Sequence, residues 1–383
     1  MRTVPQAPPS EMSEGLRRPS RRIAPSALGR SSRRLPVILV AAVFALSACT
    51  TTGPGSGGSV TTASATSATP ASPAAPSASP APTASFPLTL TDDEGGSLTV
   101  STAPRKIVSL TPGTTEIAFA IGAGSRVVAT TDFDDYPAEV KSLPHVATYE
   151  AVDVEKIVGL GADLVIAGGN GFTKPDAVTR LRALGIPVLV VYAKDVPGVL
   201  SDVQLVGQAV GEPARAANLA ASMQAGIDQI SAATQSLPHP RTFYELDATK
   251  EIYGPAPNSF VAEMVSLAGG DPITTGDPGV FSIPLEKLVA ADPEVIVLGD
   301  ANFGTTPAVV KARPGWGAMS AVKAGLVVPI DDTTVSRPGP RLVEGLRVLA
   351  LAIHPDLELP GASSSGSPFA SPSASPAAVV GRP

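Results

Sequence analysis

Two segments of this 383-residue chain repeat one another, and the repeat limits the possible fold more than any other feature. The segment VEKIVGLGADLVIAGG (154–169) aligns without a gap on LEKLVAADPEVIVLGD (285–300). Each copy has the pattern of a short amphipathic helix, a turn at Gly or Asp-Pro, and four β-branched or aliphatic residues. Two such units predict two similar αβ lobes within one chain.

Apolar runs of strand length surround both copies of the repeat. The candidates are 106–110, 127–130, 164–167 and 188–192 in the first lobe, and 242–246, 295–298 and 327–329 in the second. Because these runs alternate with helical patterns, they predict an α/β fold with largely parallel sheets covered on both faces. The segment TLTDDEGGSLTV (89–100) alternates around a Gly-Gly pair and predicts a hairpin before the first lobe.

The segment between the lobes has helical patterns. A first helix is expected over 196–210, and Gly-Glu-Pro at 211–213 interrupts it, with the proline suited to a first helical turn. An Ala-rich helix then continues over 214–236. At about 1.5 Å per residue it forms a rod of roughly 35 Å, which is a stiff connection between two lobes.

The two ends of the chain differ in composition from its middle. Eight arginines in 1–34 precede an apolar run at 35–48, which is shorter than the about 20 residues of a membrane span and predicts an export signal. Stretches rich in Ser, Thr, Ala and Pro predict a flexible tether and a disordered tail. The resulting boundaries are a signal peptide 1–48, a tether 49–85, an N-terminal αβ lobe 86–194, a bridging helical segment 195–238, a C-terminal αβ lobe 239–360 and a tail 361–383.

Cys49 is the only cysteine, and it follows Leu-Ser-Ala at the end of the apolar run. This resembles the bacterial lipobox, whose cysteine is lipidated and becomes the mature N-terminus; the alternative is an unmodified cysteine near a cleavage site. A single cysteine excludes an internal disulfide, a thiolate zinc site and an iron–sulfur cluster. The part after residue 48 has 20 basic and 32 acidic side chains, which argues against a nucleic-acid partner.

The sequence lacks the usual patterns of catalysis. The three histidines have no ligand-like spacing, and Gly-x-Ser-x-Gly, a Walker loop and Gly-x-Gly-x-x-Gly after a strand are all missing. The acidic cluster Asp132, Asp134 and Asp135 reads as a solvated loop rather than a hydrolytic pair. The sequence therefore predicts no enzyme, no resident cofactor and no bound metal ion.

The stretch TPGTTEIAFAIGAG (111–124) follows the first strand of the first lobe. Thr111 suits an N-cap, Pro112 the first helical position and Gly122 the end of the helix. A helix that starts at the carboxyl end of a parallel strand faces the crevice of an αβ sheet. We therefore expect Thr111 and Thr114 to line one wall of a ligand cleft.

Several segments in one order carry a family resemblance. PRKIVSLTPGTTEIAFAIGAG, VDVEKIVGLGADLVIAGG, NSFVAEMVSLAGG and RPGPRLVEGLRVLALAIHP lie within 86–355, nearly the whole folded part. Together they resemble the periplasmic binding proteins of cobalamin and ferric-siderophore ABC importers, in the lipoprotein form. The resemblance implies two αβ lobes joined by one long helix, a ligand in the cleft between them, and a monomeric receptor outside the cell membrane that serves an ABC permease.

The resemblance also implies functional residues. Candidate ligand contacts are Thr111, Thr114, Tyr149, the loop 168–171, Phe172, Tyr253, Phe303, Trp316, Arg337 and Arg341. Two of them have an alternative role, since Trp316 also suits the core of the second lobe and Arg337 also suits pairing between the lobes. Permease docking through one acidic residue on each lobe points to Glu263 in the second lobe and to Asp176 as the nearest acid in the first.

The ligand itself stays open at this stage. Few convergent arginines favour cobalamin or a neutral hydroxamate complex, whereas the hairpin before the first strand occurs in siderophore-type relatives. Aromatic residues make up 4% of the chain, which disfavours a large heme slot. The alternatives outside transport are an envelope scaffold with a binding-protein fold and an exported enzyme on the same scaffold.

Overall fold

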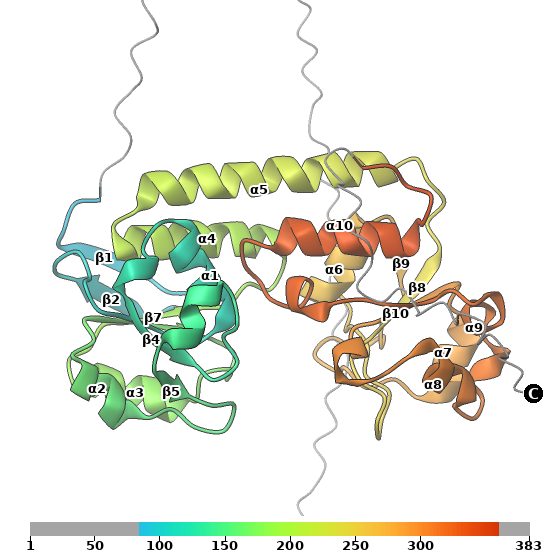
Figure 1. The fold of residues 1–383 in the computed structure, drawn as a ribbon, viewed down its shortest axis with the longest axis horizontal. Coiled ribbons are helices and arrows are strands. Elements are labelled where there is room, and N and C mark those ends of the chain that lie inside the picture. Colours follow the sequence, from blue (N-terminus) through green and yellow to red (C-terminus); the bar gives the residue numbers. More distant parts are fainter. Residues whose placement is uncertain (1–83, 360–383) are drawn as a thin grey trace, which may run out of the picture. The chain divides into compact units, whose positions relative to one another are not determined.

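The computed structural model describes residues 84–359, all within one compact unit. The predicted signal peptide, Cys49, nearly all of the tether and the tail lie outside the described residues. Within the described range, no helix is both long enough and apolar enough to cross a membrane. Two αβ lobes are joined by helices, as the repeat and the helical segment predict (Figure 1).

The first lobe contains a five-stranded parallel sheet in the order β5-β4-β3-β6-β7. Neighbouring residues of β3 enter different cores, because Ile107 packs on the side of the bridging helices and Val108 on the opposite face. Both faces of the sheet are therefore covered. The elements are β3 (Ile107–Ser109), α1 (Pro112–Ala120), β4 (Val127–Thr131), β5 (His145–Ala147), α2 (Val154–Leu160), β6 (Leu164–Gly168), α3 (Pro175–Ala183) and β7 (Val188–Val191).

The second lobe has a four-stranded parallel sheet in the order β11-β10-β8-β9. Its two repeat elements, α7 and β10, correspond to α2 and β6 of the first lobe, and β10 lies beside β8 as β6 lies beside β3. The elements are β8 (Arg241–Glu245), α6 (Phe260–Leu267), β9 (Asp271–Pro272), α7 (Leu285–Ala291), β10 (Val295–Leu298), α8 (Pro307–Ala312), α9 (Ser320–Ala324), β11 (Val327–Pro329) and α10 (Leu342–Ile353).

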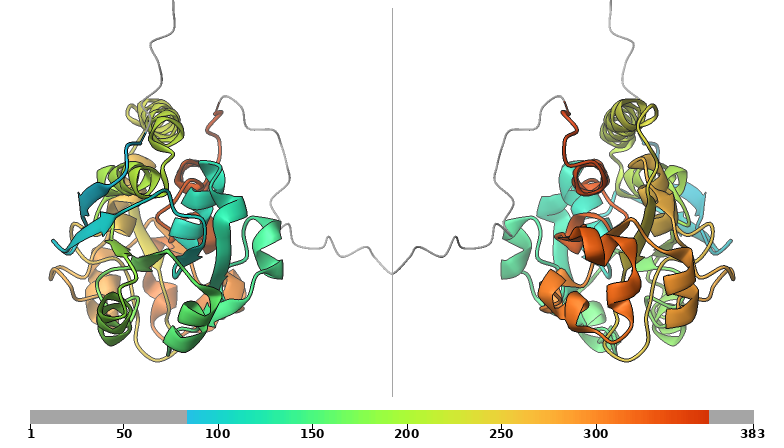
Figure 2. Two further views of the ribbon diagram at one scale, coloured as in Figure 1. Left: turned by 90° about the vertical axis from the view of Figure 1, so that its left-hand side faces the viewer. Right: turned by 90° about the vertical axis from the view of Figure 1, so that its right-hand side faces the viewer.

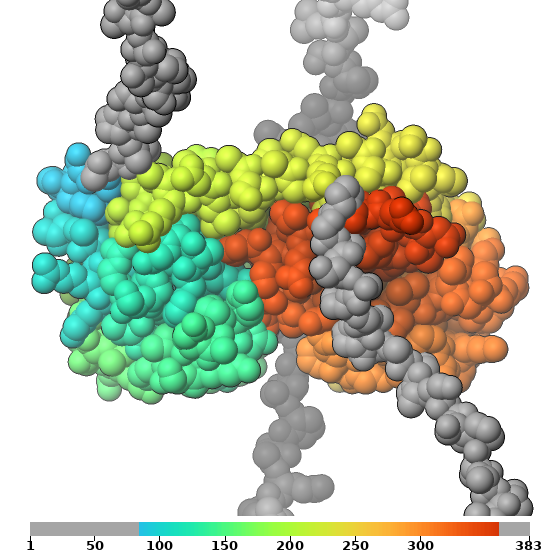
Figure 3. Space-filling model, turned by 45° about the horizontal axis from the view of Figure 1, so that its top comes forward, coloured from blue at the N-terminus to red at the C-terminus, as the bar shows by residue number. Residues whose placement is uncertain are grey.

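Two helices connect the lobes, α4 (Val196–Val210) and α5 (Pro213–Thr234). They pack closely, because a Cβ on Gly207 of α4 would lie 2.1 Å from the Cβ of Ala216 in α5. Further along, a Cβ on Gly226 would lie 2.6 Å from Val343 of α10. The helix α5 thus runs from the first lobe to the second across the top of both (Figures 1 and 3).

The predicted hairpin is confirmed as β1 (Leu88–Thr91) and β2 (Ser97–Val100), an antiparallel pair outside both parallel sheets. The α/β class with two lobes and a long bridging helix is also confirmed. Two strands were missed, β5 and β9, which hold three and two residues at sheet edges. Strands this short leave too few positions for a periodic pattern.

Candidate ligand-binding site

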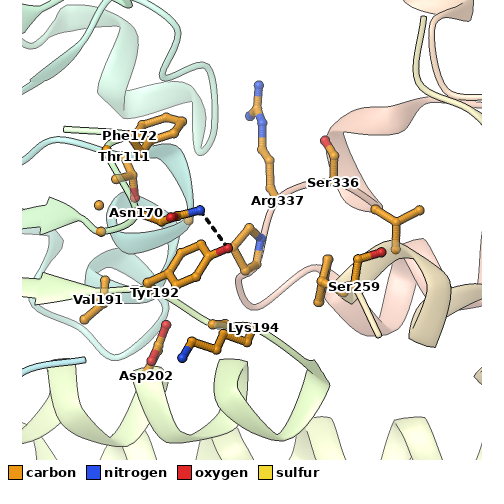
Figure 4. Close-up of a pocket in the computed structure, with 18 of the residues that line it drawn as sticks. Thr111, Asn170, Phe172, Val191, Tyr192, Lys194, Asp202, Ser259, Ser336 and Arg337 are labelled. Atoms are coloured by element: carbon orange, nitrogen blue, oxygen red, sulfur yellow. Dashed lines mark hydrogen bonds between the residues drawn. The ribbon is translucent and has the colours of Figure 1, made fainter. Parts of the chain in front are cut away.

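A cavity of about 1160 Å³ lies between the two lobes. The first lobe contributes the carboxyl ends of β3, β6 and β7, the second lobe contributes loops around α6 and before α10, and α4 adds Asp202. Figure 4 shows the two sets of residues facing each other across the open space. Drug-sized ligands occupy pockets of roughly 300–1,000 Å³, so this cavity suits a larger molecule.

The first wall begins where β3 ends and α1 starts. Thr111 is the N-cap, its hydroxyl accepting from the backbone N–H of Thr114 at 3.3 Å. The Thr114 hydroxyl is buried and lies 2.6 Å from that of Ser109, so it is already partnered inside the lobe. A Cβ on Gly113 would lie 2.4 Å from the carbonyl oxygen of Pro338 in the second lobe, so the two backbones touch beside the cavity.

The loop after β6 forms the middle of the first wall. Asn170 and Gly171 have φ angles of 53° and 76°, a left-handed pair that turns the chain back toward α3. The Asn170 side-chain amide donates to the Tyr192 hydroxyl at 3.0 Å, which joins this loop to the end of β7 (Figure 4). Phe172 packs edge-on against Phe133, with ring centroids 5.9 Å apart.

The second wall consists of polar backbone turns and aromatic side chains. Ser259 is the N-cap of α6 and accepts from the backbone N–H of Ala262. Phe260 and Phe281 line the cavity beside it, and Ser336 precedes the loop that leads to α10. Apolar rings with a few hydroxyl groups are typical of pockets that enclose organic ligands.

Charged groups in the cavity are few. Lys174 lies over the Tyr149 ring at 5.5 Å, Lys194 is exposed, and Asp202 points up from α4 toward Tyr192 (Figure 4). Burial, together with the nearby carboxyl of Asp93, raises the pKa of Asp202 to about 8. Asp202 is therefore protonated and neutral at pH 7.

Arginines of the second lobe pair with acids of the first. Glu116 is 3% exposed and accepts two hydrogen bonds from Arg341, at 2.6 and 2.9 Å. Arg341 also stacks over Tyr136 at 4.3 Å. Arg337 lies 2.5 Å from Asp135 and 3.7 Å from Glu116, and its guanidinium points away from the cavity floor (Figure 4). The positive charge of Arg337 is therefore offset within the protein.

The loop 168–171 and five of the single residues predicted to contact the ligand line the cavity: Thr111, Thr114, Tyr149, Phe172 and Arg337. The prediction is wrong for four others, which lie outside its lining; one is Arg341, which is paired with Glu116. Trp316 is 3% exposed and packs in the core of the second lobe under Arg313, whose guanidinium lies 4.6 Å from its ring. Tyr253 pairs with Glu251, and Phe303 is 90% exposed outside the cavity.

The two predicted docking acids have different surroundings. Asp176 is exposed in the first turn of α3. Glu263 is half-buried, and its carboxylate accepts the backbone N–H of Val196 at 2.7 Å, which caps the start of α4. A substitution of Glu263 will therefore disturb the bridge as well as any docking surface, whereas Asp176 gives a cleaner test.

Sequence reasoning missed part of the lining. Tyr192 is the last residue of the predicted strand 188–192, and its place at a strand end could have identified it. Asp202 sits on a helix whose polar positions look solvated, and Phe281 lies in an irregular loop. The prediction of a solvated loop is wrong for Asp134, which is only 4% exposed. One of its carboxylate oxygens accepts hydrogen bonds from Thr131, and the other has no partner. Over residues 84–359, the structure contains no group of three or more metal-ligating side chains.

Comparison with known proteins places these features in a family. Residues 107–334 match the model of the periplasmic binding protein family. The uncharacterized ABC transporter substrate-binding lipoprotein YvrC of Bacillus subtilis is 33% identical over 279 residues, which cover 72% of this chain and 88% of that one.

Two further relatives carry names that specify a ligand. A cobalamin-binding protein of Halobacterium salinarum is 29% identical over 284 residues, with 70% of this chain and 75% of that one covered. The solved structure of the periplasmic heme-binding protein RhuT from Roseiflexus is 26% identical with a TM-score of 0.59, and 66% of this chain covers 99% of it.

Proposed function

Because this chain belongs to the periplasmic binding protein family and is not an enzyme, we propose that it captures cobalamin or a close corrinoid between its lobes and delivers it to an ABC permease. The observation that carries the proposal is the size and chemistry of the cavity. It holds about 1160 Å³ and is lined by small polar groups at strand ends, four phenylalanines and two tyrosines. A large, mostly neutral ligand with peripheral amides matches such a surface.

The charges in the cavity favour a corrinoid over an anionic siderophore. The charge of Arg337 is offset by Asp135 and Glu116, so within residues 84–359 the lining cations that form no salt bridge are Lys174 and Lys194. A polyanionic catecholate or citrate complex would require several convergent cations. Two lysines are enough for the single phosphate of cobalamin.

Heme remains the second candidate, since RhuT has a similar fold and comparable identity. The described lining contains no histidine, methionine or cysteine, so only Tyr149 or Tyr192 could serve as an axial ligand to the iron. A corrinoid carries its own axial base and needs no such residue. This difference supports cobalamin as the first ligand to test.

The proposed location rests on the sequence outside the described residues. Lipidation of Cys49 would hold the receptor at the outer face of the membrane, with 49–85 as the tether, and the B. subtilis relative is named a lipoprotein. A Cys49→Ser variant should then be released from the membrane fraction. Retention of that variant at the membrane would refute the lipid anchor.

A thermal-unfolding titration tests the ligand. The purified protein would be heated with cyanocobalamin, a ferric hydroxamate, a ferric catecholate, ferric citrate and heme in parallel. A ligand at 100 times its Kd stabilises the fold by about 2.7 kcal/mol, and we expect this shift with cyanocobalamin. A shift with heme or a siderophore alone would replace the ligand, and no shift with any compound would reject the transport proposal.

A further inference from the structure

The β1–β2 hairpin has a tip of three consecutive acids, Asp92, Asp93 and Glu94, followed by Gly95. We call Asp92–Gly95 the hairpin tip. Its stem is anchored by Leu90 and Leu98, which are buried in the core shared with the bridging helices. Figure 2 shows the hairpin, in blue, at the side of the first lobe below α5. The burial of these two leucines fixes the position of the tip relative to the first lobe.

Each acid of the tip holds a different segment of the first lobe. The fully buried carboxylate of Asp92 accepts from Arg182 of α3 at 2.7 Å. The carboxylate of Asp93 accepts the backbone N–H of Tyr192 at 2.7 Å, and its own N–H donates to the Val190 carbonyl. Together these bonds also satisfy the free edge of β7, the last strand of the sheet.

Glu94 reaches the loop that forms the middle of the cavity wall. Its carboxylate accepts the backbone N–H of Asn170 at 2.9 Å, although the side chain itself is exposed. Asn170 has a φ of 53°, in the left-handed region that asparagine adopts more readily than most residues, and the bond to Glu94 holds its N–H in that turn. The same Asn170 donates to Tyr192, so Glu94 and Asp93 act on two joined segments of one wall.

From this geometry we propose that the hairpin tip positions the first wall of the ligand cavity. Glu94 and Asp93 do not line the cavity; they fix the backbone of Asn170 and Tyr192, which do line it. They are positioning residues. Carboxylate acceptors suit this role because their bonds to backbone N–H groups are among the stronger hydrogen bonds in proteins. If the loop is already ordered before the ligand binds, binding loses less conformational entropy and the affinity is higher than with a mobile loop.

The test compares Glu94→Ala, which removes the acceptor, with Glu94→Gln, which keeps one. Glu155→Ala is the matched control, because Glu155 is an exposed acid on α2 of the same lobe. Hydrogen exchange of the ligand-free protein is measured at the Asn170 and Tyr192 amides. We expect Glu94→Ala to accelerate exchange at Asn170 by about tenfold, the factor for one charge-assisted hydrogen bond, with substantial rescue by Glu94→Gln. The control should match the wild type.

Affinity for cyanocobalamin is the second measurement, and this part alone rests on the proposed function. It should fall about three- to tenfold in Glu94→Ala and recover in Glu94→Gln. If the wild type binds no cobalamin, the proposed ligand is wrong while the exchange data still decide the role of the tip. Unchanged exchange at Asn170 and Tyr192 in Glu94→Ala, or a uniform acceleration across the lobe, would overturn the inference.

Discussion

The two lobes contain the same helix–turn–strand unit but use its strand end differently. Gly169 follows β6 in the first lobe, and Asp300 occupies the equivalent position after β10 in the second. Gly169 lines the cavity, whereas Asp300 is 4% exposed and accepts from the Thr305 hydroxyl at 2.7 Å. The first lobe leaves the end of its repeat strand open to a ligand, and the second fills it with its own side chains.

Charged and polar side chains occupy the strand ends of the second lobe. Glu245, at the end of β8, is fully buried and accepts two hydrogen bonds from Arg313, at 2.7 and 2.8 Å. Tyr244 donates to Asp332 after β11. Burial and the neighbouring Asp300 raise the pKa of Glu245, Arg313 lowers it, and the net result is a pKa of about 7. The sheet of the second lobe is thus closed by a charged network, and the ligand meets its loops instead.

Breaking the network of the second lobe should have the largest effect. Arg313→Ala leaves Glu245 buried without its cation, and we expect a loss of about 3–5 kcal/mol of unfolding free energy at pH 8. In the absence of Arg313, burial and Asp300 still raise the pKa of Glu245, and the arginine no longer lowers it. A carboxyl with a raised pKa in the fold costs stability as pH rises from its unfolded pKa to its folded pKa. The extra loss in the variant should therefore shrink below about pH 7, the pKa of Glu245 in the wild type. Chemical denaturation at pH 8 and pH 5.5 measures both values.

Arg215→Ala is the control for that variant. Arg215 is 63% exposed and lies 3.8 Å from Glu212 on α5, so its removal should change stability by less than about 1 kcal/mol at either pH. Equal losses for Arg313→Ala and Arg215→Ala would mean that the charged closure of the second lobe contributes no more than a surface pair.

The open strand end of the first lobe is tested directly by replacing Gly169 with aspartate, the residue found at the equivalent position 300 of the second lobe. In Gly169→Asp the new Cβ lies 2.9 Å from the Tyr192 Cβ and 3.1 Å from the Glu94 carboxylate, which also repels the added charge. We expect the affinity for cyanocobalamin to fall by more than about tenfold, equal to about 1.4 kcal/mol. Gly159→Asp adds the same charge at an exposed α2 position with nothing within 4 Å, and should bind as the wild type does. Normal affinity in Gly169→Asp would contradict the open strand end.

The sequence predicted the parts of this contrast that have a repeating pattern. The strands of the repeat, the bridging helices and the hairpin are marked by apolar periodicity and glycines, and Thr111 by its capping position. Pairings such as Glu116 with Arg341, 225 residues apart, leave no local signal, because a charge on a helix looks solvated until its partner is known. The sequence left Trp316 between the cavity and the core of the second lobe for the same reason: its burial depends on elements far along the chain, and the structure supports the core.

The smallest effect is expected at Asp202, the buried acid that the bridging helix α4 places at the cavity. With a pKa near 8, Asp202 keeps its proton in the fold while the unfolded chain loses it above about pH 4. Stability should therefore decrease as pH rises toward 8, and Asp202→Asn, which cannot ionise, should lack that decrease. Between pH 7 and 8.5 we expect the variant to gain roughly 1 kcal/mol on the wild type by thermal unfolding.

Asp228→Asn, at an exposed position of α5, should keep the wild-type pH dependence and serves as the control. Because Asp202 lines the cavity whereas Glu245 is sealed behind Arg313, a bound neutral ligand should deepen the burial of Asp202 and leave Glu245 unaffected. Cyanocobalamin should therefore steepen the pH dependence of the wild type and not that of Asp202→Asn. If the ligand steepens the pH dependence of the wild type and of Asp202→Asn equally, the carboxyl that responds to the ligand is not Asp202.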